Sequence, residues 1–137
     1  KMSEHTQLTV SVVTIEGEQL HETCDFVKCF SSTGDLGVYP EHTSAVILLA
    51  DTDLVLEKNE KESRYFVSEG ILTVKDNVVT IMTDVLLTKD DLSREELETS
   101  VSTATQAYLK KSTYQGQEAA RKERLSSEAK LRVLSAD

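Results

Sequence analysis

The spacing of apolar residues changes near Asp90, and this change constrains the fold more than any other feature of the sequence. From Leu8 to Val12 apolar and polar residues alternate, which is typical of a half-buried β-strand. Beyond Asp90 the apolar residues recur at helical spacing, as Leu97, Val101, Ala104 and Tyr108. The sequence therefore predicts two parts: an all-β N-terminal sandwich or flattened barrel at 1–89, followed by a C-terminal antiparallel α-helical hairpin at 90–137.

The N-terminal part consists of short extended segments separated by turn signals. The run 45–50 is continuously apolar, which predicts a strand buried on both faces. Asp76 and Asn77 tolerate the left-handed backbone region and predict a tight hairpin turn. The expected strands are 7–14, 19–30, 45–50, 53–58, 64–68, 71–74 and 78–82, and the β part closes near Leu87.

The C-terminal part reads as two helices. Ser93 and Glu96 form a capping box that predicts the start of the first helix, and Gly116 is expected to break it. A second helix is expected from about 118 to 135. Because the apolar stripe is thin and the first helix is rich in serine and threonine, the pair is marginal by itself. It needs another surface to lie against.

The segment 34–42 joins two expected strands and carries two glycines, the single proline and a histidine. Both glycines permit positive φ, and the proline fixes its own φ, so we expect a shaped loop that presents polar side chains. A plain structural turn is the alternative. If the loop binds another protein, its candidate contact residues are Gly34, Asp35, Gly37, Tyr39, Pro40, Glu41 and His42.

The net charge of −9 excludes some classes of partner. Residues 1–90 hold seven basic and sixteen acidic residues, so the whole excess lies in the β part. This acidic part repels nucleic acid and anionic membranes. Cys24 and Cys29 lack the spacing of a metal or redox pair and are expected to be buried, reduced thiols of a cytosolic protein. The sequence shows no signal core and no apolar run of membrane-spanning length, so a partner would have to hold the protein at any membrane.

The sequence offers little for catalysis. It contains no nucleophile elbow, no phosphate-binding P-loop and no histidine pair at metal spacing, so neither a catalytic nor a metal site is predicted. An enzyme therefore remains a remote alternative. The second helix carries a basic cluster of Arg121, Lys122, Arg124, Lys130 and Arg132, interleaved with glutamates. This cluster is either a solvated helix face or a surface for an acidic partner.

Taken in order, these features resemble the epsilon subunit of F-type ATP synthase over essentially the whole chain. The resemblance rests on the 8–17 strand and turn, the Gly-x-x-Gly-Val-Tyr-Pro-x-His segment at 34–42, the hairpin 70–84, and Leu131-Arg132-Val133. The chain departs from the family at Phe30-Ser31-Ser32, where proline or glycine is frequent, and at Glu41, where a small residue is frequent.

The resemblance implies a non-catalytic rotor subunit that couples rotation of the c-ring to the central stalk. It implies that the sandwich packs on the gamma subunit and that Asp35 contacts the c-ring, with Glu41 and His42 facing the ring or gamma. The hairpin would lie on the sandwich or extend along gamma into the alpha/beta catalytic head and oppose ATP hydrolysis there. Its basic face, Arg121, Lys122 and Arg124, would meet an acidic loop of the catalytic subunit.

The resemblance also carries expectations about ligands and location. Some bacterial members bind ATP through an Ile/Leu-Asp-x-x-Arg-Ala motif; here Leu97 and Glu98 match it in part, but Val101 stands at the arginine position. Without that cation we expect weak or no ATP binding and no cofactor. The isolated subunit is expected to be a monomer, located peripherally on the cytoplasmic face of a bacterial inner membrane. The alternative function is a free-standing β-sandwich adaptor with a helical dimerisation tail.

Overall fold

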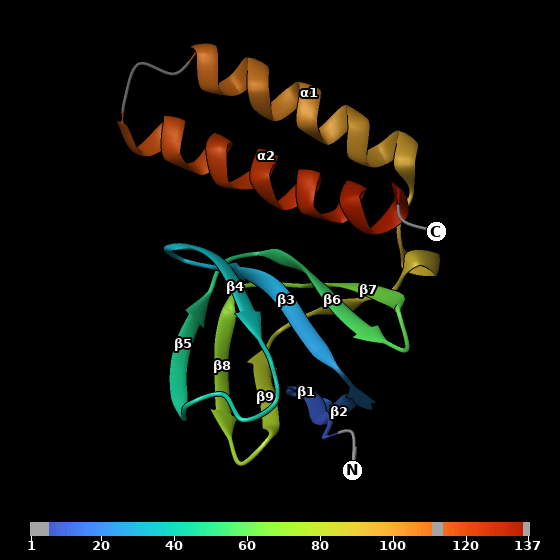
Figure 1. The fold of residues 1–137 in the computed structure, drawn as a ribbon. Coiled ribbons are helices and arrows are strands. Elements are labelled where there is room, and N and C mark those ends of the chain that lie inside the picture. The colour runs from blue at the N-terminus through green and yellow to red at the C-terminus, as the bar shows by residue number, and fades with distance from the viewer. Residues whose placement is uncertain (1–5, 111–113, 136–137) are drawn as a thin grey trace.

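The computed structural model describes residues 6–110 and 114–135 and has a β part followed by two helices (Figure 1). The strands are β1 (Leu8–Thr14), β2 (Gly17–Cys24), β3 (Phe26–Ser31), β4 (Gly34–Val38), β5 (Ala45–Leu49), β6 (Thr52–Lys58), β7 (Lys61–Val67), β8 (Gly70–Lys75), β9 (Val78–Thr83) and β10 (Leu86–Leu87). A 3-10 turn, η1 (Lys89–Asp91), precedes α1 (Arg94–Lys110) and α2 (Tyr114–Ser135). The predicted fold class, a β-sandwich followed by a helical hairpin, is confirmed.

The strands form one continuous hydrogen-bonded sheet that folds over on itself. Its order is β10-β7-β6-β3-β5-β8-β9-β1-β2, and β4 pairs with β3 outside this path. Only one residue pair, Ser31 with Leu49, joins β3 to β5, so the sheet divides there into two layers. All its pairings are antiparallel except that of β1 with β9, which is parallel.

The core lies between the two layers. The alternation predicted from the sequence is confirmed in β1, where Leu8, Val10 and Val12 are fully buried. Cys24 and Cys29 are free thiols and both are buried, as expected. Burial raises the pKa of the Cys29 thiol to about 12, so this thiol is neutral and unreactive at ordinary pH.

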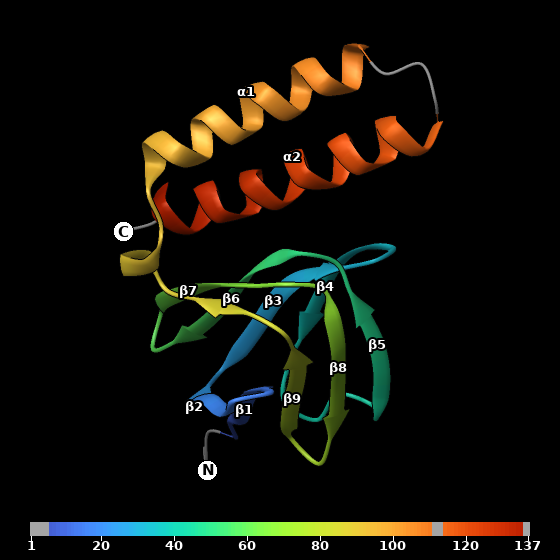
Figure 2. The ribbon, with the colours of Figure 1, turned by 180° about the vertical axis from the view of Figure 1, so that it is seen from behind.

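The helices pack against each other as an antiparallel pair, and α2 lies between α1 and the sandwich (Figures 1 and 2). The predicted helix start is confirmed, because the Glu96 backbone N–H donates to Ser93 Oγ at 3.3 Å. The second helix begins earlier than expected, so the prediction that Gly116 ends a helix was wrong. A glycine within a helix costs only about 1 kcal/mol, and packing of α2 against α1 offsets that cost.

Two predictions about the strands were wrong. The extended run 19–30 is interrupted at Asp25 and forms two strands that lie in different layers. The apolar run of β5 is not buried on both faces, because Val46 is 75% and Leu48 61% exposed. The sequence showed apolar side chains on both faces of β5, but burial of the second face requires another element to cover it.

Candidate functional site

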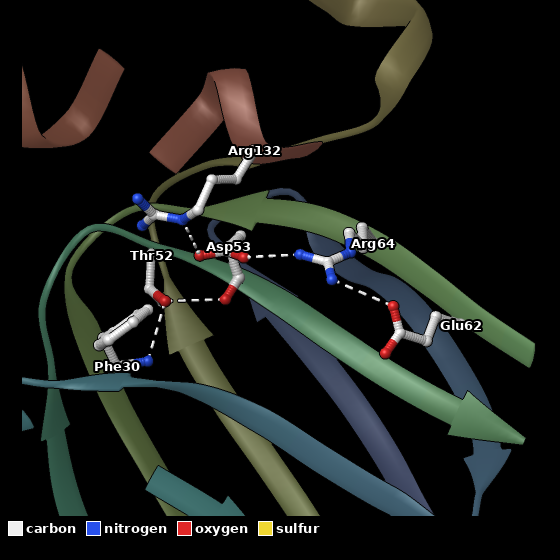
Figure 3. Close-up of polar contacts among 6 residues, drawn as sticks. All are labelled: Phe30, Thr52, Asp53, Glu62, Arg64 and Arg132. Carbon is white, nitrogen blue, oxygen red and sulfur yellow. Dashed lines mark hydrogen bonds and ion pairs between the residues drawn. The ribbon is translucent and has the colours of Figure 1, made fainter. Parts of the chain in front are cut away.

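Asp53 is the centre of a polar cluster where the helical hairpin meets the β-sandwich (Figure 3). Its side chain is 6% exposed, yet two arginines from different elements contact it. Arg64 of β7 reaches Oδ2 at 3.1 Å, and Arg132 of α2 reaches Oδ1 at 3.0 Å. Each carboxylate oxygen therefore contacts one guanidinium, so both oxygens of this buried side chain have a charged hydrogen-bond partner.

The alternation of β6 explains why this carboxylate faces the helices. Leu54 and Leu56 belong to the core between the layers, so Asp53 and Val55 point to the opposite, outer face of the sheet. On that face Asp53 lies beside Phe66, its partner residue on β7. Both are buried, Asp53 at 4% and Phe66 at 2% exposure, because α2 covers this layer.

The neighbouring Thr52 completes the local hydrogen bonding at the point where β3 and β6 diverge. The pairing of these strands ends at Lys28 and Val55. Beyond it, the Phe30 backbone N–H donates to Thr52 Oγ1 at 2.9 Å, and that hydroxyl donates to the Asp53 carbonyl oxygen at 2.7 Å (Figure 3). A buried threonine hydroxyl thus replaces the missing strand-to-strand contact.

A small apolar cluster supports the same interface. Phe66 packs with Ala129 and Val133 of α2, and Leu87 and Leu92 adjoin them. Two cations of α2 also lie over aromatic rings of the sandwich: Lys130 Nζ is 4.8 Å from the ring centre of Phe66, and the Arg132 guanidinium is 5.3 Å from that of Phe30. We call this whole contact, Asp53 with Arg132 together with these residues, the hairpin interface.

Beside the hairpin interface there is a cavity of about 310 Å³ between α2 and the sandwich. Its lining combines apolar side chains with the charged rim of Asp51, Glu69, Lys122 and Arg132. The charged groups contact one another: Lys122 pairs with Glu69 at 3.5 Å, and Asp51 accepts the Glu69 backbone N–H at 2.7 Å. The packing of α2 on the sandwich is therefore incomplete.

The side chains of the predicted basic face of the second helix form ion pairs with two different elements, α2 itself and the sandwich. Arg121 pairs with Glu118 at 3.6 Å and Arg124 with Glu128 at 4.0 Å, both along α2 itself. Lys122 instead reaches across to the sandwich. The three side chains are 41–67% exposed, so they remain accessible on the helix surface.

The segment 34–42 is not one loop. Gly34–Val38 is the strand β4, paired with β3 through a turn in which the Thr33 backbone N–H donates to Ser31 Oγ at 3.2 Å. Gly34 has φ +136°, as expected, but Gly37 does not lie in the left-handed region. At Gly37 the lack of a side chain makes room for the ring of Phe26, which stacks on Tyr39 with ring centres 4.3 Å apart.

The two ends of this segment lie at opposite ends of the sandwich. Asp35 is exposed and lines a hollow together with Asp53 and Arg132, beside the hairpin. After Pro40 the chain reaches the turn between β8 and β9, at the end of the sandwich away from the hairpin (Figure 1). There the Glu41 backbone N–H donates to Asn77 Oδ1 at 2.6 Å, and Asn77 Nδ2 donates to Glu41 Oε2 at 2.9 Å.

The residues that follow β4 lie at the end of the sandwich away from the hairpin. The His42 backbone N–H donates to the Tyr39 carbonyl oxygen at 3.2 Å, which closes the turn around Pro40. Glu41 adopts φ 67°, a left-handed conformation that is uncommon for a non-glycine residue. The reciprocal contact with Asn77 stabilises it. The structure therefore brings Glu41 and His42 together and separates them from Asp35.

The partial nucleotide motif lies near the start of α1. Leu97 is buried, Val101 is half-buried, and Glu98 pairs with Arg94 at 3.7 Å. Within residues 6–110 and 114–135, no group of three or more His, Cys, Asp or Glu side chains is placed to hold a metal ion. In the same part of the chain, no helix has both the length and the apolar character needed to cross a membrane.

Sequence reasoning missed Asp53 as the centre of the interface. Its contact with Arg132 joins residues 79 positions apart, which no local pattern can reveal. One signal was present: an acidic residue directly precedes the apolar run Leu54 to Leu56 within an expected strand. A charge in such a position requires a partner.

Comparison with known proteins identifies the relatives of this chain. Residues 7–89 match the family described as "ATP synthase, Delta/Epsilon chain, beta-sandwich domain". An ATP synthase epsilon chain of Hydrogenovibrio crunogenus is 28% identical over 91 residues, which cover 66% of this chain and 63% of that protein. One of Levilactobacillus brevis is 29% identical over 108 residues, covering 74% of this chain and 78% of that protein.

Solved structures show the same fold. A chain of the Euglena gracilis mitochondrial ATP synthase, from an OSCP/F1/c-ring structure, superposes with a TM-score of 0.81 at 20% identity, covering 98% of this chain and 86% of that one. A chain of the Tetrahymena thermophila mitochondrial ATP synthase, from a central stalk/c-ring structure, gives 0.66 at 14% identity, covering 97% and 100%. The likeness extends over both the sandwich and the helices.

Proposed function

Because this chain belongs to the ATP synthase delta/epsilon family, we propose that it is a non-catalytic rotor subunit that links the c-ring to the central stalk and restrains ATP hydrolysis through its helical hairpin. The sandwich binds the gamma subunit and the c-ring. The hairpin binds the alpha/beta catalytic head when it leaves the sandwich. The subunit works at the membrane surface, on the cytoplasmic side in a bacterial cell, where its partners hold it.

The small size of the hairpin interface is the observation that supports a regulatory role for the hairpin. Among the described residues, Phe66, Ala129 and Val133 form its buried apolar cluster, whereas sixteen buried residues form the core cluster of the sandwich. A sandwich with its own core keeps its structure when the hairpin leaves. Two packings that differ by a few kcal/mol are what a ligand-driven or partner-driven switch needs.

The positions of the two ends of the segment 34–42 suggest that they bind different partners. Asp35 and Glu41 lie at opposite ends of the sandwich, so both cannot rest on one flat ring surface. We assign Asp35 to the c-ring and the end formed by Glu41 and His42 to gamma. The exposed basic side chains Arg121, Lys122 and Arg124 are the surface that the hairpin offers to an acidic loop of the catalytic head.

The proposal is tested by ATP hydrolysis of a catalytic head from which the epsilon subunit has been removed. The full chain, or a version ending at Lys89, is added back, and both binding and hydrolysis are measured. We expect the full chain to bind and slow hydrolysis, and the shortened version to bind without slowing it. If both bind and neither slows hydrolysis, the inhibitory role is wrong and only coupling stands. If neither binds, the motor assignment fails and the adaptor hypothesis replaces it.

A further inference from the structure

The apolar face of α2 is longer than the apolar surface that the sandwich provides for it. Leu125, Ala129 and Val133 follow one another at intervals of one helical turn, so they lie on one face of the helix. Ala129 and Val133 are buried together with Phe66, but Leu125 remains 41% exposed. Leu125 instead lines the cavity of about 310 Å³ between α2 and the sandwich. The apolar contact between the two parts is therefore interrupted there.

The sandwich side of this cavity is also apolar. Phe30, which is 39% exposed, and Ala50 line it together with Leu125. Apolar walls give water no hydrogen-bond partners, so water fills such a space poorly. Sites for small molecules are mostly apolar, often lie between structural units and begin at about 300 Å³. The cavity has the size, position and lining of a site for a small ligand.

The charged residues at the rim already contact other groups of the protein. Lys122 pairs with Glu69 at 3.5 Å, and Arg132 pairs with Asp53 at 3.0 Å. Asp51 accepts the Glu69 backbone N–H at 2.7 Å. A charged ligand would have to displace one of these contacts and lose its own hydration beside apolar walls. The rim therefore favours an uncharged ligand.

Two planar groups line the cavity and favour an aromatic ligand. Phe30 and Arg132 both belong to the lining, and the guanidinium lies 5.3 Å from the centre of the Phe30 ring. Arg132 contacts Asp53 through Nε, and its two terminal nitrogens point away from that carboxylate (Figure 3). An aromatic molecule stacks on a phenylalanine ring and attracts a guanidinium, whereas a saturated ring of similar size does neither.

We propose that this cavity binds a small, uncharged aromatic molecule, which holds the helical hairpin on the sandwich. Leu125 and Arg132 contribute to the site from α2, and Phe30 and Ala50 contribute from the sandwich. The complete site exists only while the two parts are in contact, so the ligand binds the closed hairpin alone. At a free concentration ten times its dissociation constant, it lowers the population of the open hairpin about elevenfold.

Size and charge argue against two other occupants. A nucleotide would bring several negative charges to a rim that contains Asp51 and Glu69. A helix of a partner protein is about 10–12 Å across and is too wide for a cavity of about 310 Å³ between α2 and the sandwich. A small neutral ligand meets neither obstacle.

The first test fills the cavity from within the protein. Leu125→Phe places a larger side chain at an exposed position of its lining, where the buried core is not disturbed. The matched control is Leu109→Phe, the same substitution at a position of α1 that is 74% exposed and does not line the cavity. Thermal unfolding of each full-length variant checks that the fold is kept.

Binding is measured with N-phenylnaphthylamine, an uncharged aromatic probe whose fluorescence rises in apolar surroundings. We expect the original chain and Leu109→Phe to bind it within about twofold of each other, and Leu125→Phe to bind it at least roughly tenfold more weakly. Equal binding by all three proteins, or no binding by the original chain, would overturn the proposal.

Competition against the bound probe tests the chemistry of the ligand. Naphthol should displace the probe, and its saturated analogue decahydronaphthol should require roughly tenfold more. Equal displacement by the two would show that the site does not select aromatic molecules. Naphthalene sulfonate and naphthylmethylamine carry opposite charges. If either displaces the probe more effectively than naphthol does, the rim recognises a charge and the proposal is wrong.

Hydrogen exchange of backbone amides tests whether the ligand holds the hairpin. N-phenylnaphthylamine should slow exchange in α2 of the original chain and leave exchange in Leu125→Phe unchanged. Probe binding without protection of α2 would mean that the ligand does not join the two parts, which contradicts the proposal. These measurements use the isolated chain, so their failure leaves the proposed function intact.

The effect on ATP hydrolysis rests on the function proposed above. In the assay with the epsilon-depleted catalytic head, the probe should relieve inhibition by the full chain and should not relieve inhibition by Leu125→Phe. Protection of α2 without any relief would show that closing the hairpin does not control hydrolysis. If the full chain binds the probe but does not slow hydrolysis, the inhibitory function fails and the binding site stands.

Discussion

The two arginines on Asp53 allow the hairpin interface to be perturbed with a built-in control. Arg132 belongs to α2 and crosses to the sandwich, whereas Arg64 belongs to the sandwich itself. Methionine at either position keeps much of the apolar stem and removes the guanidinium. We therefore expect Arg132→Met to release the hairpin selectively and Arg64→Met to destabilise the sandwich without that selectivity.

The magnitude follows from the contacts of Arg132. A hydrogen bond to a charged group contributes about 1.5–3 kcal/mol when buried. Arg132 is 45% exposed, so solvent screening reduces this to about 1 kcal/mol. Its position over the ring of Phe30 adds about 0.5 kcal/mol. The sum of about 1.5 kcal/mol corresponds to a roughly tenfold larger population of the open hairpin.

Hydrogen exchange of backbone amides under native conditions measures this opening directly. In Arg132→Met the amides of α2 should exchange about tenfold faster, while those of β6 and β7 keep their rates. In Arg64→Met, whose side chain is 22% exposed, exchange should rise in β6 and β7 as well. Equal acceleration of α2, β6 and β7 in Arg132→Met would refute the reasoning, because it would mean that the hairpin and sandwich open as one unit. A double-mutant cycle with Asp53→Asn isolates the pair.

Three further predictions concern the sandwich and the helices. Gly70→Ala should lower the free energy of unfolding by about 1–3 kcal/mol, measured by urea denaturation, because a Cβ at Gly70 would collide with the carbonyl oxygen of Met82. The folded pKa of the Cys29 thiol, about 12, lies above its ordinary value of 9.0, so the associated stability is complete below pH 9 and is lost as the pH rises towards 12. Cys29→Val should therefore remove about 3 kcal/mol of the alkaline loss of stability, as measured by unfolding at pH 8 and pH 11, because the interval from pH 9 to pH 11 spans about two pH units at about 1.36 kcal/mol each. Calorimetry with ATP should show weak or no binding, since Val101 stands where the nucleotide motif requires arginine; a micromolar dissociation constant would contradict this.

The sequence allowed the fold to be predicted because its signals were local. Period-two spacing identified the inward faces of strands such as β1, and the Ser93 cap marked the first helix. The pattern could not show which faces would be covered. β5 is as apolar as a fully buried strand, yet Val46 and Leu48 remain exposed because the hairpin lies over the other layer.

The candidate site depended on contacts that are not local, and for this reason much of it was not predicted. Asp53 becomes central only when β6 pairs with β7 and α2 lies above both. The segment 34–42 reads as one motif, but five of its residues form a strand that carries its ends apart. Sequence proximity suggested that Asp35 and Glu41 act together, and the length of β4 separates them.

The energy of the hairpin interface matches what a switch requires. Burying Phe66 and Val133 contributes about 1.5–3 kcal/mol each, and Ala129 less, before the cost of ordering α2 is subtracted. Arg132 adds about 1.5 kcal/mol by the estimate above. Inverting a two-state population from 99:1 to 1:99 takes about 5.5 kcal/mol of differential binding. A partner that binds the extended hairpin can supply that amount, whereas a larger apolar interface would hold the hairpin permanently on the sandwich.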